Sequence, residues 1–198
     1  MNKKTSHHHG DLRAALIRSG AELIQDGGVE ALTVRKVAAH AGVSHAAPAH
    51  HFKHLTDLRN AVAASGYLAF AAAMQAEIAH AGDAPHDIIL AAGRGYITFA
   101  RENPGMFHLM FGGWCDAHPS DELQLAADQA YEVLRQITAP LAPGPAGALG
   151  NEILVWSIVH GFSSLLLGNS DNTEFQENAL DLFCAIFPKL PLLTPGST

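Results

Sequence analysis

The chain has 198 residues, 48% of them hydrophobic, and a formal net charge of -7. This apolar content can bury a sizeable core, which excludes a disordered polar chain. Its two cysteines, Cys115 and Cys184, are too few for a disulfide framework and lack zinc-site spacing, so we expect a protein of a reducing compartment.

The start of the chain lacks the basic flank and short apolar segment of a secretory signal. Its least polar run, residues 153–167, is too short and too polar to cross a bilayer. We therefore expect a soluble, cytoplasmic protein with no membrane partner.

Charge is divided unevenly along the chain. Residues 1–60 hold eight Lys or Arg against five Asp or Glu, a balance of +3, so the remaining residues carry -10. Eight of the thirteen histidines also lie in residues 1–60. A basic N-terminal segment followed by an acidic remainder of the chain indicates that the first sixty residues bind a polyanion.

The first predicted helix covers residues 11–25, where apolar side chains recur at helical spacing until two glycines, from Gly27, end the pattern. It is expected to pack behind the next two helices. Before it comes a run of three histidines beginning at His7. Three consecutive histidines cannot all face one ion from a regular helix, so we expect no metal site there.

Residues 33–58 have the pattern of short helices joined by a tight turn. Thr33 is placed to cap a helix over residues 34–41, and Gly42 is placed to end it. The apolar positions of this helix share one face. The opposite face carries Arg35, Lys36 and His40.

The next predicted helix covers residues 45–51. Ser44 is placed to cap it, and its first turn tolerates Pro48 because the amides there have no helical partner. Phe52 and either Leu55 or Leu58 are expected to anchor it to the helix that follows. Two capped helices around a tight turn are the helix-turn-helix pattern of DNA-binding proteins.

The segments HHGDLRAAL, GVSHAAPAHHF and TDL resemble the DNA-binding domain of the TetR family of bacterial transcriptional repressors. The resemblance implies that residues 45–51 enter the major groove, with the first of them near base edges. The residues expected at the DNA are Thr33, Arg35, Lys36, Ser44, His45, Ala46, Ala47, Ala49, His50, His51, Lys53 and His54.

Two positions depart from the family pattern. Ala49 stands where an aromatic residue is common, and Leu55 stands where a lysine usually begins the next helix. Both usual side chains would contact phosphate, and phosphate contacts supply affinity. We therefore expect weakened DNA binding unless His50, His51, Lys53 or His54 replaces those contacts.

Six more helices are predicted, which makes about nine in all. Residues 104–114 are apolar on every face, so other helices must enclose them. Thr173 is placed to cap the last helix. The six span residues 56–80, 86–103, 104–114, 119–138, 148–169 and 173–190, with a loop at 139–147.

The helix over residues 148–169 is apolar on two faces. Ile153, Trp156, His160 and Leu167 share one face, and Val155, Val159, Phe162 and Leu166 share the other. One face can fill the core of the chain, whereas the second needs a partner. A row of small residues, Ser157, Gly161, Ser164 and Gly168, would let another helix come close. The pattern predicts a homodimer through the last two helices.

The segment WSIVHGF resembles the Trp, His and Gly signature of one class of TetR regulatory domains. Together with YITFARENPGMFHLMF, it extends the resemblance over most of the chain and implies a cavity for an apolar or aromatic effector, with His160 or Tyr96 as a polar anchor. Ordinary core packing is the alternative for each of these side chains. The residues expected to line the cavity are Phe70, Met74, Tyr96, Phe99, Met106, Phe107, Met110, Phe111, Trp114, Trp156 and His160.

An enzyme is the main competing class. Asp116, His118, Ser120 and Asp121 are close in sequence, but they flank Pro119 on a loop and lack a nucleophile motif. Helix capping and solvation explain them better, so we expect no catalytic residues and no cofactor.

The sequence therefore predicts an all-α protein with a helix-turn-helix DNA-binding domain over residues 1–55 and a regulatory and dimerisation domain over residues 56–198. We expect a homodimeric repressor of a palindromic double-stranded DNA operator. A small-molecule effector would release it by shifting the helix that begins at Thr56. The alternative is a degenerate family member that binds small molecules but binds DNA poorly.

Overall fold

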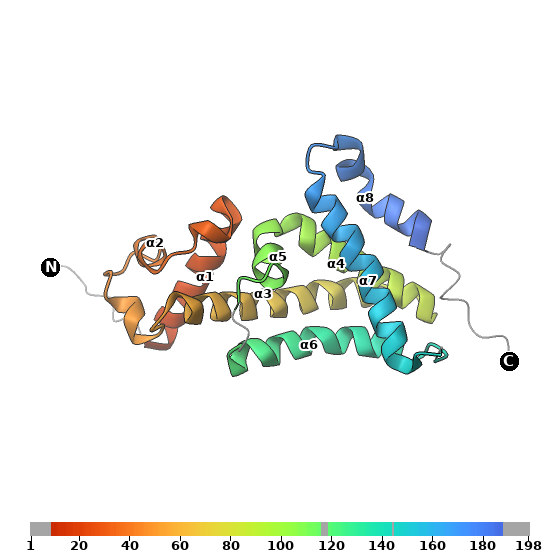
Figure 1. Cartoon of the computed structure of the whole chain (residues 1–198), viewed down its shortest axis with the longest axis horizontal. Helices are drawn as coiled ribbons and strands as arrows, with labels where there is room; N and C mark the ends of the chain where they lie inside the picture. Colours follow the sequence, from red (N-terminus) through yellow and green to blue (C-terminus); the bar gives the residue numbers. More distant parts are fainter. Residues whose placement is uncertain (1–8, 116–118, 144, 188–198) are drawn as a thin grey trace. The chain divides into compact units, whose positions relative to one another are not determined.

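A computed structural model of the chain describes residues 9–115, 119–143 and 145–187, with side chains from residue 12 onward. Within these residues the fold is all-α, as predicted, with eight α-helices and two short 3-10 helices (Figure 1). The elements are α1 (His9–Gly27), η1 (Val29–Ala31), α2 (Val34–His40), η2 (Ala47–His50), α3 (Leu55–Ile78), α4 (Pro85–Glu102), α5 (Pro104–Phe111), α6 (Asp121–Thr138), α7 (Gly147–Gly168) and α8 (Thr173–Ile186).

The helices form two compact units. The first unit comprises Met1–Gly66 and Gly105–Ala126, and the second comprises Tyr67–Pro104 and Ala127–Thr198. The first half of α3 and nearly all of α5 thus belong with the N-terminal helices, while α4, α7 and α8 belong to the second unit. The functional division into residues 1–55 and 56–198 stays a prediction.

The core of the first unit is built by α1, α2 and the first half of α3. Leu16, Val37 and Leu58 are completely buried, and Phe52 is 3% exposed, as its predicted anchoring role requires. α5 approaches α1 closely, because a Cβ atom added to Gly105 would lie 2.5 Å from the carbonyl oxygen of Ile24. Apolar residues of α5 are enclosed, as its sequence predicts.

In the second unit α4 is the central helix, packed against both α7 and α8. Its predicted apolar stripe, Ile89, Ala92, Tyr96 and Phe99, is buried. On α7, Val155, Val159, Phe162 and Leu166 are buried, so of the two predicted apolar faces this one fills the core. Phe183 of α8 is completely buried and lies against Gly93 of α4.

Helix caps agree with the sequence only in part. The Thr33 hydroxyl accepts a hydrogen bond from the Lys36 amide, as predicted. The cap of α8 is Asn172, whose side chain accepts from the Phe175 amide, so the prediction of Thr173 was wrong by one residue. Both residue types cap helices well, and the backbone turn decides between them.

Among the described helices, α3 alone has the length and apolar composition of a membrane span. The core helix of a water-soluble protein meets the same criterion. Ala61, Val62 and Ala64 of α3 are buried inside the first unit, and Phe70 and Met74 are buried inside the second. The apolar character of α3 is therefore accounted for by packing.

Candidate DNA-binding and effector sites

The turn after α2 is fixed by two backbone hydrogen bonds. The Val43 amide donates to the Ala38 carbonyl, and the Gly42 amide donates to the Ala39 carbonyl, at 3.0 and 3.1 Å. This pair of bonds is the Schellman arrangement, which needs a left-handed residue after the helix. Gly42 has φ of 68°, a conformation that costs a glycine little. The predicted stop at Gly42 is confirmed.

The segment expected to be a recognition helix over residues 45–51 is shorter and tighter in the structure. It consists of turns and the 3-10 helix η2, Ala47–His50, and its N-cap is Ala46 with no side-chain cap bond. The prediction of a Ser44 side-chain cap was therefore wrong. The backbone carbonyl of Ser44, and not its hydroxyl, accepts a hydrogen bond in this turn, from the Ala47 amide. Because Pro48 has no N–H, it removes one donor from this short turn.

Pro48 is the inward anchor of this segment. It is buried, and its carbonyl accepts from the amides of both His51 and Phe52. The residues predicted to meet DNA surround it and mostly point to solvent. Nine of the twelve are exposed, and the other three are half-buried. The exposed ones are Arg35, Lys36, Ser44, His45, Ala46, Ala49, His50, Lys53 and His54, and the half-buried ones are Thr33, Ala47 and His51.

The start of α3 is held by Asp57. Its carboxylate accepts from the backbone amides of Lys53 and His54, both at 2.9 Å, which satisfies two donors that lack helical partners. These bonds fix the backbone of Lys53 and His54 while both side chains stay exposed. Leu55, at the position where a lysine was expected from the family pattern, is half-buried.

The residues predicted to line an effector cavity fall into two groups, one in each unit. In the first unit, Phe107 and Phe111 have ring centroids 4.8 Å apart, and the Arg59 guanidinium lies 5.3 Å from the centroid of the Trp114 ring. Met106 and Met110 of this group both lie against Gly66 of α3. A single cavity lined by all eleven residues stays a prediction.

The second group is centred on Tyr96. Its ring meets the Phe70 ring edge to face, with centroids 4.6 Å apart, and Phe70 also contacts Phe99 at 5.3 Å. The Tyr96 hydroxyl lies 2.7 Å from Nδ1 of His160, which joins α4 to α7. The predicted polar anchors, Tyr96 and His160, are thus a bonded pair.

Burial raises the pKa of Tyr96 well above its ordinary range and lowers the pKa of His160. Tyr96 therefore keeps its proton near neutral pH, and burial favours a neutral imidazole. The tautomer of His160 decides which of the two side chains donates in this bond.

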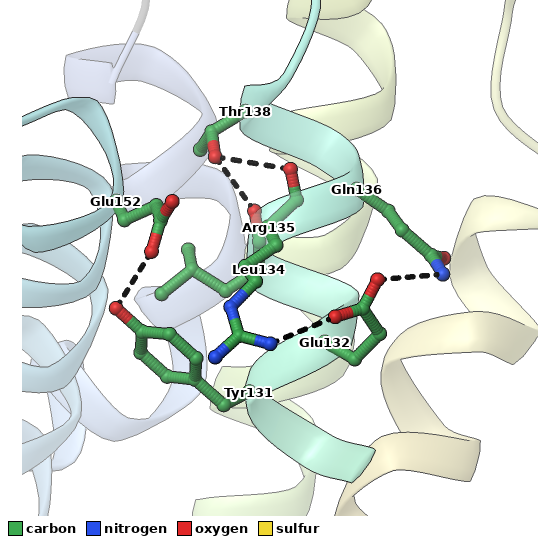
Figure 2. A network of polar contacts seen from close by, with 7 residues as sticks. All are labelled: Tyr131, Glu132, Leu134, Arg135, Gln136, Thr138 and Glu152. Atoms are coloured by element: carbon green, nitrogen blue, oxygen red, sulfur yellow. Dashed lines mark hydrogen bonds and ion pairs between the residues drawn. The ribbon is translucent and has the colours of Figure 1, made fainter. Parts of the chain in front are cut away.

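Sequence reasoning missed a second polar contact on α7. Tyr131 of α6 donates to Oε2 of Glu152 at 2.7 Å, and Figure 2 shows the phenol pointing at the carboxylate on the neighbouring helix. This hydrogen bond is the main cause that raises the pKa of Tyr131. The Tyr131 and Trp156 rings also meet edge to face, with centroids 6.0 Å apart. A sequence signal existed, since Glu152 is the single Asp, Glu, Lys or Arg of α7.

Comparison with known proteins identifies the family. Residues 16–62 match the model of bacterial regulatory proteins of the tetR family, and residues 89–184 match that of the tetracyclin repressor-like C-terminal domain. Together the two matches cover more than half of the chain. The chain belongs to the TetR family. It is therefore a DNA-binding transcriptional regulator with a helix-turn-helix.

Solved structures show the same fold. A protein of unknown function from Rhodococcus sp. RHA1 is 26% identical, with a TM-score of 0.74 over 92% of this chain and 97% of that one. The TetR family transcriptional regulator PfmR from Thermus thermophilus is 19% identical, with a TM-score of 0.54 over 75% and 84%. The transcriptional regulator SCO7222, a TetR from Streptomyces coelicolor, is 18% identical, with a TM-score of 0.61 over 81% and 72%. No curated protein matches the chain.

The loop cluster considered for catalysis in this TetR family regulator is explained in part by capping. The Ser120 hydroxyl accepts from the Leu123 amide at 3.3 Å at the start of α6. Asp116 and His118 lie outside the described residues. Among the described residues no three His, Cys, Asp or Glu side chains gather as metal ligands, and the histidine run from His7 falls largely outside them.

Proposed function

We propose that this TetR family regulator is a homodimeric, cytoplasmic repressor that binds a palindromic operator and is released by a small-molecule effector. The observation that carries the proposal is the exposed segment around η2, held by the Gly42 turn and by Pro48, in a chain that belongs to this family. An enzymatic role receives no support from the family.

The homodimer is supported by the second face of α7. Leu149, Ile153 and Leu165 are 61%, 46% and 61% exposed, and Leu182 and Ile186 of α8 are 43% and 42% exposed. Fully burying an exposed side chain of this size contributes about 1.5–3 kcal/mol, so covering the exposed half of each of these five contributes about half of that. The small-residue row of α7, Ser157, Gly161, Ser164 and Gly168, is exposed as well.

DNA binding is supported by the distribution of charge around η2. Arg35 and Lys36 on α2 and Lys53 before α3 are exposed, and His45 and His50 are exposed between them. Positively charged side chains at such positions bind DNA phosphates. The small side chains of η2 allow the backbone to approach base edges closely. A two-fold dimer would place two such segments about one turn of DNA apart.

Effector release is supported by the Tyr96–His160 pair, which joins α4 to α7 beside the buried Phe70 ring of α3. A ligand that binds one state of the dimer better than the other shifts the populations toward that state. We infer that the preferred state moves α3, whose first residues adjoin the DNA-binding segment, so that the two segments lose the operator spacing.

A degenerate member that binds DNA poorly is the second candidate. Ala49 is exposed and offers no hydroxyl, and Leu55 is half-buried and offers no charge, so the two usual phosphate contacts are missing. The exposed Lys53 and His54 favour retained binding, because Asp57 fixes their backbone.

The charge-removing variant Arg35→Gln/Lys36→Gln tests the proposed DNA face. Binding of a labelled mixed-sequence duplex is measured by fluorescence anisotropy over a series of salt concentrations. Each lost phosphate contact reduces the slope of log K against log salt by about 0.9. We expect a shallower slope and weaker binding for the variant. The control Arg101→Gln removes an exposed positive charge from α4 and should leave the slope unchanged. Equal slopes for all three proteins would contradict the assignment.

A further inference from the structure

Glu152 is an unusual residue in its helix. α7 contains no other Asp, Glu, Lys or Arg in its 22 residues, and its neighbours are mostly apolar. Half-buried carboxylates are usually paired, because desolvation of a charge is costly. Glu152 accepts a hydrogen bond from the neutral Tyr131 phenol, but no cation is paired with it among the described residues. Its negative charge is thus oriented but not neutralised.

Aromatic rings flank this carboxylate. Tyr131 orients Oε2, and Trp156 lies one helical turn after Glu152 on α7 and meets the Tyr131 ring at an angle of 75°. All three side chains are half-buried, so a ligand can reach them. The carboxylate bonds the Tyr131 hydroxyl, and the Tyr131 and Trp156 rings meet beside it. A carboxylate close to tyrosine and tryptophan rings is the chemistry that recognises an organic cation.

The surroundings favour a positive ligand. The described residues of the second unit include eleven Asp or Glu and only three Lys or Arg, so this unit is acidic. One of these, Arg135, already places its guanidinium 4.9 Å from the centroid of the Tyr131 ring, where Glu132 holds it by an ion pair of 3.0 Å (Figure 2). A cation of the chain itself therefore already lies at this ring.

We propose that Glu152, Tyr131 and Trp156 bind the positively charged nitrogen of an aromatic amine or quaternary ammonium effector. The inference rests on the proposed function, because it names the chemical class of the ligand that the second unit would sense. The nitrogen would lie against the Glu152 carboxylate and the ring faces, and the apolar part of the ligand would supply further burial.

A pair of probes of equal shape tests the charge requirement. Benzyltrimethylammonium carries the cation, and neopentylbenzene is its neutral carbon analogue. Binding of each to the full-length protein is followed by tryptophan fluorescence and by thermal shift. We expect the cation to bind at least about fivefold more tightly than the neutral probe.

Variants then test whether the preference for the cation depends on Glu152. Glu152→Gln keeps an oxygen that can accept from Tyr131 but removes the charge. Its affinity for the cation should fall about tenfold, and its affinity for the neutral probe should be unchanged. The matched control Glu177→Gln, at an exposed position of α8, should behave as the wild type. Arg135→Gln should bind the cation more tightly, because it removes a competing charge from the Tyr131 ring.

Three outcomes would overturn the inference. They are equal binding of the two probes, unchanged binding of the cation by Glu152→Gln, and no binding of the cation by the wild type. Each of them leaves the DNA-binding regulator in place, because that proposal is tested by DNA binding and operator selection. A failure of operator selection, with the charge preference intact, would instead support the degenerate small-molecule-binding protein.

Discussion

Replacing Gly161 with leucine is expected to separate the dimer into single chains. Gly161 is exposed, and a Cβ atom added there meets nothing within 4 Å in the chain itself, so the position is open for a side chain. The exposed small-residue row around it can be approached closely only while its side chains stay small. Light scattering after gel filtration should give twice the mass of one chain for the wild type and the mass of one chain for Gly161→Leu.

The loss of the dimer should carry over to DNA binding. A single chain binds one half-site and lacks the binding free energy that the second half-site adds. Operator affinity should therefore fall by about 100-fold or more. The control is Ala76→Leu, at an exposed position of α3, which should remain dimeric. Circular dichroism of both variants checks that the helices are intact. A dimeric Gly161→Leu protein with wild-type affinity would show that the partner covers another surface.

Gly95→Ala is expected to give the largest loss of stability. A Cβ atom at Gly95 would lie 2.5 Å from the Ala73 carbonyl oxygen and 2.7 Å from the Met74 Cα atom. Both are backbone atoms of α3, so α3 and α4 must move apart. The gain in helix propensity is at most about 1 kcal/mol, while overpacking of this kind costs about 1–3 kcal/mol or more. Because both contacts are with backbone atoms, we expect the upper end of this cost and a net loss of up to about 2 kcal/mol in the free energy of unfolding, measured by urea denaturation.

The matched control for this substitution is Gly82→Ala. There the new Cβ atom would meet the end of the Asp87 side chain, at 2.7 Å, and that carboxylate can rotate away. Its stability should stay within about 0.5 kcal/mol of the wild type. Gly95→Ala should also disturb the adjacent Tyr96–His160 bond, which links α4 and α7. Equal stability of the two variants would contradict the close approach of α3 and α4.

The sequence predicted helix faces better than local backbone detail. The buried stripe of α4 and the buried face of α7 follow from helical periodicity, which depends on residue spacing alone. The 3-10 geometry of η2 was not predicted, because Pro48 permits several short turns and contacts along the chain select one. Ser44 and Thr173 have suitable side chains for capping, but the backbone placed other residues at those positions.

Side-chain contacts between different helices could not be predicted from the sequence. The Tyr131–Glu152 bond joins residues 21 positions apart and depends on the angle at which α6 meets α7. The aromatic residues predicted to share one cavity belong to two units, and no periodicity could have divided them. The Tyr96–His160 pair was foreseen only as two separate candidates for a polar anchor.

Selection of bound sequences from a random DNA pool, with the full-length protein at low salt, tests whether a dimer reads two half-sites. We expect a palindromic consensus whose half-sites are centred about one helical turn, or about 10 base pairs, apart. The selected duplex should bind two chains. A pool without enrichment, or a consensus without two-fold symmetry, would contradict the claim that a dimer presents two η2 segments to duplex DNA.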